Sequence, residues 1–377
     1  MKKITLVAIL VLLFFSVEVL AQKTNFSTRV PEKVKIKNVF SKSSSVNSVS
    51  SLSGSIAVAE NATYNAYTVQ ELVNNLLISG CLETSDIRFG YYDKDGSSWG
   101  WVDHSWSTTA GNRQLGYFSQ ASSDFPIDEG IIFSTGKISS AEGSNDTGSV
   151  TDRMNSEASD PDLAAITGKR MYDASVLEFN FIPNGNVIEF KFVFASDEYL
   201  EYCDTDFNDA FGFFLSGYGI SGGYTNGAVN LARVPGTNEE ITINNIHSEG
   251  TNVYGDTFPN QNVAYYVNNP SGSTTMQYDG MTTVLTATYA VEPGESYKIK
   301  MAIADASDQQ WDAGAFLKAR SFNTNTLVVN DPDQVCAQGT VDLTAAAITE
   351  GSSSGLTYTY WEDEFAITPY IDYIAAT

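Results

Sequence analysis

Hydrophobic and polar residues alternate most regularly between positions 187 and 217, in the pattern of two strands joined by a loop. The first strand has large apolar side chains at every second position, namely Ile188, Phe190, Phe192 and Phe194. Alternation resumes at Phe211, Phe213 and Leu215 and ends at Gly217. Successive side chains of a strand point to opposite faces, so each run predicts a strand with one buried apolar face.

The loop between these two strands is strongly acidic. It contains six carboxylates in thirteen residues and no lysine or arginine, the six being Asp197, Glu198, Glu201, Asp204, Asp206 and Asp209. Such carboxylates repel one another unless a positive charge lies among them. Ca²⁺ takes oxygen ligands from loops of this kind. The alternative is a solvated loop that only keeps two strand ends in water.

A second stretch repeats the arrangement of strand, acidic loop and strand. Alternating apolar residues from Ile299 to Ile303 are followed by Asp305, Asp308 and Asp312, and residues 315–322 again have the pattern of a strand. If both loops lie at one end of a sandwich, their carboxylates can bind one ion. Acids at rigid strand ends are preorganised, which predicts five Ca²⁺ ligands, namely Asp197, Glu198, Asp209, Asp305 and Asp312.

Short strand patterns separated by turn residues continue through most of the chain, which is rich in aromatic residues, with 20 Tyr and 21 Phe. One helix is expected over residues 66–79, because Thr68 and Glu71 form a capping box ahead of an apolar stripe. The prediction is an all-β fold, an antiparallel two-sheet sandwich of jelly-roll type with this one N-terminal amphipathic helix packed on it.

The first 21 residues have the features of a secretory signal peptide. Lys2 and Lys3 precede an apolar run from Ile4 to Phe15, and small residues at the end indicate cleavage near Ala21. The serine-rich residues 22–55 predict a flexible linker. The β domain is expected over residues 56–325, in a secreted or cell-surface protein without a transmembrane helix in its mature form.

Residues 332–377 are expected to form part of a second domain. Cys336 precedes Trp361 by 25 residues, an order found in immunoglobulin-like sandwiches, but such a domain needs about 100 residues. We therefore interpret the segment as a truncated immunoglobulin-like domain. A short disordered tail is the alternative.

The net charge is −24, and removal of Lys2, Lys3 and Glu18 with the signal peptide makes it −25, from 19 basic and 44 acidic residues. This charge argues against nucleic acid as a partner, because nucleic acid selects basic surfaces. It suits an extracellular protein that meets divalent cations.

Three cysteines are present, and export permits disulfides. Cys81 and Cys203 both fall in the first domain and are the predicted pair, which leaves Cys336 unpaired within the chain. The alternative is that all three are free. His104 and His247 are the only histidines, and neither lies in a nucleophile-elbow or zinc-protease motif, which argues against Ser-His-Asp hydrolysis and zinc.

Three tryptophans, Trp99, Trp101 and Trp106, follow Tyr91 and Tyr92 in one aromatic stretch. They are candidates for a sugar-binding platform. The alternative is that they pack inside the sandwich or within a loop.

Seven segments together resemble the choice-of-anchor L domain family of secreted bacterial proteins. They run in family order through most of the mature chain: Phe133 to Gly136, Tyr172 to Phe179, Phe194 to Tyr202, Phe207 to Phe214, Val234 to Thr237, Tyr278 to Leu285 and Ile303 to Asp308. The resemblance implies a surface location and differing C-terminal anchoring or sorting signals among members, including type IX secretion. It implies no settled biochemical activity.

The leading hypothesis is an exported or cell-surface, non-enzymatic module for adhesion or glycan binding, stabilised by Ca²⁺ between the acidic loops. Its partner would be an extracellular glycan or a surface protein. The first alternative is a glycan-cleaving hydrolase that uses two loop carboxylates as acid and base. The second is a purely structural module of a large surface protein.

Overall fold

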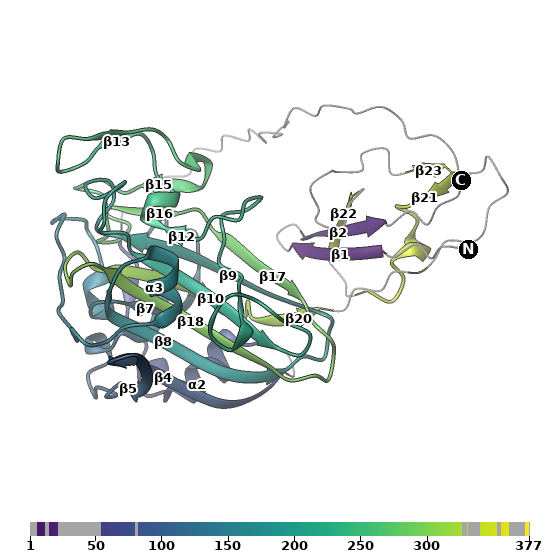
Figure 1. Cartoon of the computed structure of the whole chain (residues 1–377), viewed down its shortest axis with the longest axis horizontal. Coiled ribbons are helices and arrows are strands. Elements are labelled where there is room, and N and C mark those ends of the chain that lie inside the picture. Colours follow the sequence, from purple (N-terminus) through teal and green to yellow (C-terminus); the bar gives the residue numbers. More distant parts are fainter. Residues whose placement is uncertain are drawn as a thin grey trace.

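Two antiparallel β-sheets face each other in the computed structural model, which describes residues 6–11, 15–21, 54–79, 82–325, 330, 340–352, 356–361 and 374–376 (Figure 1). One sheet has seven strands, in the order β11 (Val229–Asn230), β10 (Ala210–Gly217), β18 (Tyr297–Ala306), β8 (Met171–Ile182), β4 (Glu83–Asp95) and β5 (Ser98–Asp103), with β12 (Ile241–Thr242) also paired to β10.

The other sheet has nine strands and is also antiparallel. Its order is β15 (Tyr266–Asn268), β16 (Gly280–Thr282), β9 (Val187–Ser196), β19 (Ala313–Lys318), β7 (Glu129–Ser134), β6 (Leu115–Ser119) and β3 (Ala57–Val58), with β17 (Leu285–Ala290) and β20 (Asn323–Asn325) also paired to β9. A separate hairpin consists of β13 (Gly250–Thr251) and β14 (Thr257–Phe258). The prediction of an all-β antiparallel sandwich is confirmed.

Aromatic side chains from β9 and β10 fill the space between the sheets. The ring centroids of Phe190 and Phe213 are 4.0 Å apart, and those of Phe192 and Phe211 are 5.1 Å apart. All four side chains are at most 1% exposed. These are the alternating positions identified in the sequence, so the period of two directly produces the inter-sheet core.

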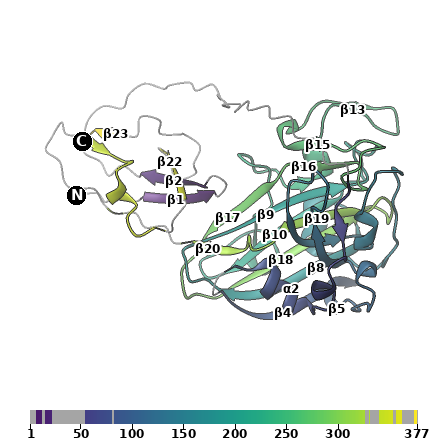
Figure 2. The ribbon, with the colours of Figure 1, turned by 180° about the vertical axis from the view of Figure 1, so that it is seen from behind.

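The predicted amphipathic helix is shorter than expected and changes type along its length. The capping box of Thr68 and Glu71 is present, α2 covers Val69–Leu72, and a π-helical turn continues over Val73–Leu77. Figure 2 shows α2 beside β4, which it contacts. Backbone N–H groups of Arg320 and Phe322 donate to the carbonyls of Leu76 and Leu77 at the end of this helix. Two further short helices, α1 (Ala62–Asn65) and α3 (Pro161–Thr167), were not indicated by the sequence pattern.

Two acidic loops cross between the two sheets at the same end of the sandwich. The first acidic loop leads from the end of β9 to the start of β10, and the second leads from the end of β18 to the start of β19. Ser196 pairs with Ala313 in one sheet, and Ala210 pairs with Ala304 in the other. The register therefore brings both acidic loops together, as the sequence analysis required for a shared ion.

The stretch from Ala141 to Asp162 is polar and rich in Gly, Ser and Asp, which is typical of a surface loop, but parts of it are buried. Asn145 and Asp160 are both 0% exposed. Asp160 caps α3 by accepting backbone N–H groups of Asp162 and Leu163, each at 3.0 Å. Asn145 and Asp160 can be buried because they contact hydrogen-bonding partners far away in the sequence.

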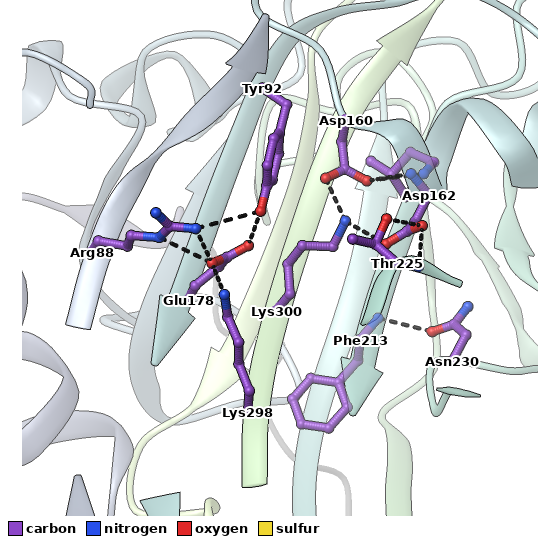
Figure 3. Close-up of polar contacts among 11 residues, drawn as sticks. Arg88, Tyr92, Asp160, Asp162, Glu178, Phe213, Thr225, Asn230, Lys298 and Lys300 are labelled. Carbon is purple, nitrogen blue, oxygen red and sulfur yellow. Dashed lines mark hydrogen bonds and ion pairs between the residues drawn. The ribbon is translucent and has the colours of Figure 1, made fainter. Parts of the chain in front are cut away.

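Buried ion pairs attach α3 to the outer face of the seven-stranded sheet (Figure 3). The Lys300 Nζ on β18 lies 2.5 Å from Asp160 Oδ2 and 2.7 Å from Asp162 Oδ2. Beside it, Glu178 on β8 accepts hydrogen bonds from Arg88 and from the Tyr92 hydroxyl. Burial acts to raise the pKa of Glu178, but hydrogen bonds from Lys298, Tyr92 and Arg88 lower it overall.

The ends of the chain form small separate sheets in the described residues. Strand β1 (Leu6–Val11) pairs with β2 (Phe15–Ala21), which runs parallel to β22 (Leu356–Trp361). Strand β21 (Thr340–Asp342) pairs with β23 (Ile374–Ala376). Residues 22–53 of the expected linker lie outside the described residues. The signal peptide and the immunoglobulin-like domain stay predictions.

Cys203 is buried, and among the described residues it is a free thiol. Its Sγ lies 3.8 Å from the Ile243 carbonyl. The predicted partner Cys81, like Cys336, lies outside the part of the chain that the structure describes. The pairing therefore stays a prediction.

We expect Lys300→Ala to destabilise the fold by roughly 3–5 kcal/mol, because it leaves two buried aspartates without their counter-ion. The matched control is Lys318→Ala, which breaks the exposed pair with Asp128 and should cost less than about 1 kcal/mol. Urea unfolding of both variants measures the difference. Equal losses would show that the buried pairs contribute no more than a surface pair.

Candidate functional site

The five acids predicted as metal ligands all lie at the end of the sandwich where the chain crosses between sheets. Each one is at most 1% exposed: Asp197, Glu198, Asp209, Asp305 and Asp312. They come from the ends of β9 and β18 and from the residues just before β10 and β19. Within the described residues, none of the five forms an ion pair with a lysine or arginine.

Part of this acidic cluster is held by hydrogen bonds. Asp209 accepts from the Ser196 hydroxyl at 3.0 Å and from the Ala306 N–H at 3.1 Å, which links the two crossings. Asp312 accepts from the Asp152 N–H at 3.0 and 3.1 Å. Asp197 accepts from the Val150 N–H through Oδ2. Three of the five acids are thus oriented by donors on both sheets or on the long loop after β7.

The remaining oxygens of the acidic cluster are buried without a hydrogen-bond partner. They are both carboxylate oxygens of Glu198, both of Asp305, and Oδ1 of Asp197. The Asp209 N–H lowers the pKa of Glu198 and the Thr135 hydroxyl lowers that of Asp305, but burial and neighbouring carboxylates raise both by more. Buried polar atoms normally have partners, so these five oxygens carry a desolvation cost that no hydrogen bond offsets.

Burial and mutual repulsion raise the pKa of every acid in the cluster. Burial is the largest cause for Asp197, Asp209 and Asp312, and the pKa of each rises to about 8. Burial also raises the pKa of Glu198 and Asp305 well above the usual range, and the neighbouring Asp209 raises both further. In the absence of a cation, the cluster therefore retains protons that a solvated carboxyl would lose.

Two more acids border the cluster and were missed in the sequence analysis. Asp173 is fully buried, accepts the side-chain amide of Gln309 at 3.0 Å, and raises the pKa of both Asp305 and Asp312. Burial raises the pKa of Asp279 to about 6. Both residues lie within segments that carry the family resemblance. The acids inside those segments could therefore have identified them as members of the site.

The carboxylates do not already form a coordination sphere. Within the described part of the chain, no three Asp, Glu, His or Cys side chains are arranged as a metal-binding group. The backbone brings the acids to one end of the fold, but their oxygens do not converge on one point. Cation binding at this end therefore requires carboxylate side chains to turn inward.

The three tryptophans do not form one platform. Trp99 lies under Lys94 with the ammonium 5.3 Å from its ring, and Trp101 is covered by Arg88 at 3.9 Å. Trp106 instead contacts the Arg113 guanidinium at 4.2 Å and lines a separate cleft. Only Trp106 is placed to meet a ligand in that cleft.

A two-sheet sandwich with acidic crossings defines the structural class of this protein, and the sequence comparison identifies the family. Residues 58–323 match the choice-of-anchor L domain, and the chain belongs to that family. No curated protein and no solved structure matches the chain significantly. The family consists of surface-associated modules, which makes this a secreted or surface-anchored protein. None of the described helices has the length and apolar character needed to span a membrane.

We expect the metal-free protein to lose stability as pH rises from about 4 to about 8. The acids keep their protons up to a higher pH in the folded protein than in the unfolded chain. Their contribution to the free energy of unfolding is therefore complete below the pKa of the unfolded state, and it is lost as the pH rises through the pKa of the folded state. Unfolding in chelator across this range provides the measurement. Asp312→Asn should reduce the proton uptake on folding by about one, whereas Asp204→Asn in the exposed loop should leave it unchanged. A flat profile for the parent would contradict the raised pKa values.

Proposed function

We propose that the chain is a non-catalytic module of a secreted or cell-surface protein, that Ca²⁺ held among its acidic crossings stabilises it, and that it serves adhesion or glycan binding. One observation carries the calcium part. Five carboxylate oxygens, on Asp197, Glu198 and Asp305, are buried at the sheet crossings without a partner at full hydrogen-bonding geometry.

The cost of burying ionised acids supports a cation at this place. An isolated buried carboxylate is strongly unfavourable unless it is paired or neutralised. Protonation neutralises the acidic cluster at low pH, but at neutral or alkaline pH a divalent cation can do so with the acids ionised. The cation then removes both the desolvation cost and the repulsion between neighbouring acids.

The ligand chemistry favours Ca²⁺ over other metals. The acidic cluster supplies only oxygen donors, which suits hard cations, and it contains none of the histidine or thiolate ligands that zinc and copper prefer. Ca²⁺ accepts six to eight oxygens at about 2.3–2.6 Å in flexible geometry. Five carboxylates from two crossings, with carbonyls or water, can meet that number once the side chains turn, whereas Mg²⁺ demands a nearly ideal octahedron.

The same burial argues against acid–base catalysis by these residues. A general acid must come within about 2.6–3.2 Å of the atom that it protonates. All five acids are at most 1% exposed, so a glycosidic bond cannot reach them in this conformation. The geometry therefore favours a structural cation over the hydrolase alternative.

We expect Ca²⁺ at one hundred times its dissociation constant to add about 2.7 kcal/mol to the free energy of unfolding. Melting temperature in Ca²⁺ and in chelator at pH 8 measures this gain. Asp197→Asn and Asp305→Asn should each remove most of it, and the double variant should lose little more, because both residues act on one ion. The calcium-dependent gain should also shrink at pH 5, where protons compete for the same oxygens.

The behaviour of these variants in chelator provides a second readout. Each substitution removes an acid whose ionisation is unfavourable in the buried cluster, so at pH 8 the metal-free variants should be at least as stable as the metal-free parent. Asp204→Asn, in the exposed part of the same loop, is the matched control and should keep the full calcium response. Absence of a calcium-dependent shift in the parent would refute the site, and additive losses in the double variant would refute a shared ion.

A further inference from the structure

A cleft with a volume of about 250 Å³ lies beside Trp106, apart from the five acids of the crossings. Aromatic rings form one wall, with His104 5.1 Å from Tyr91 and 4.9 Å from Phe89. Polar side chains complete the lining, including Asn112, Arg113, Asn155 and one acid, Asp103, which accepts a hydrogen bond from the Trp101 indole N–H at 2.7 Å. Polar groups supply most of the lining opposite the aromatic wall, which suits a polar ligand. The volume is slightly below the usual range of small-molecule sites, about 300–1,000 Å³.

Arg113 is a buried cation without an acidic partner. Its Nε donates to the Ser107 carbonyl at 2.8 Å and its Nη1 donates to the Asn65 carbonyl at 3.1 Å. Within the described residues no carboxylate pairs with it, and its Nη2 has no hydrogen-bond partner. Burial lowers the pKa of Arg113, and no neighbouring acid raises it. Four other arginines each pair with a glutamate, namely Arg88, Arg170, Arg233 and Arg320.

The lack of a counter-ion at Arg113 is notable in a chain with a net charge of −24. Two carbonyls and the Trp106 ring hold the guanidinium in a fixed orientation. A fixed guanidinium is preorganised for a charge-assisted hydrogen bond to a carboxylate. The cleft therefore offers a ready anion-binding group at one position.

His104 supplies a hydrogen-bond acceptor in the same cleft. Its Nε2 lies 3.0 Å from the Ala174 carbonyl, so Nε2 carries the proton and donates. Burial lowers the pKa of His104, which keeps the ring neutral and leaves a lone pair on Nδ1. With Asn112 and Asn155 nearby, the cleft can both donate to hydroxyl groups and accept from them.

We propose that this cleft binds a saccharide that carries a carboxylate, namely a uronic acid residue. The carboxylate pairs with Arg113, the aromatic wall with Trp106 contacts the apolar face of the sugar ring, and the hydroxyl groups bond to His104 and Asn112. The inference rests on the glycan-binding part of the proposed function and names its ligand class. It does not depend on calcium, because none of the five crossing acids lines the cleft.

The test is a ligand-observed NMR titration of the whole chain with methyl glucuronide and, as its uncharged match, methyl glucoside. The two differ only in a carboxylate replacing a hydroxymethyl group. We expect saturable binding of the glucuronide at millimolar concentration or below, and binding of the glucoside at least tenfold weaker. No saturable glucuronide binding, or equal binding of both sugars, would overturn the proposal.

Three variants locate the binding. Trp106→Ala and Arg113→Gln should each weaken glucuronide binding about tenfold or more, whereas Trp99→Ala, outside the cleft, should bind within twofold of the parent. Asn112→Asp keeps the test decisive if loss of Arg113 impairs folding. Asn112 is exposed, and a negative charge there should weaken the glucuronide at least fivefold more than it weakens the glucoside. Parent-like binding in Asn112→Asp would place the ligand elsewhere.

Titrations in Ca²⁺ and in chelator separate this proposal from the calcium site. If glucuronide binds in both conditions and calcium does not shift the melting temperature, the cleft proposal is supported and the calcium proposal is contradicted. If calcium shifts the melting temperature and glucuronide does not bind, the calcium proposal is supported and the cleft proposal is contradicted.

Discussion

The fold depends on the aromatic contact between β9 and β10, which lie in different sheets but are adjacent in the sequence. All ten residues of β9 are buried, because β9 is covered on one face by the opposite sheet and on the other by loops. Packing of the tilted rings of Phe190 against Phe213 and of Phe192 against Phe211 fixes how the sheets are aligned. Once they are aligned, the loop after β9 has to cross between them, and its acids are buried at the crossing.

The second crossing, after β18, is subject to the same constraint and adds its own acids at that end. Neutral side chains could close the sandwich there at lower electrostatic cost, since buried ion clusters seldom stabilise a fold by themselves. The raised pKa values of these acids therefore make the stability of the fold depend on pH. Burying acids at one end of the molecule costs electrostatic free energy, and the size of that cost varies with the surrounding solution.

Much of this arrangement was predictable from local sequence patterns, and the rest was not for physical reasons. Alternation at residues 188–194 and 211–215 predicted both strands, and acids next to those strands predicted which carboxylates would be held at the crossings. Asn145 shows the limit, because it is buried by donating to Asn269, which lies 124 residues away. The cleft was missed for a similar reason, since Arg113 is held by backbone carbonyls that no side-chain pattern reveals.

The placement of the first and last strands of the sandwich has a mechanical consequence. Strands β3 and β20, through which the chain enters and leaves the domain, both belong to the nine-stranded sheet. Tension applied along the polypeptide therefore runs through the hydrogen bonds of that sheet and does not pull one sheet away from the other. The aromatic layer and the acidic crossings would stay closed under load until β20 shears from β9 or β3 peels from β6, which makes these two short pairings the mechanical release points of the domain.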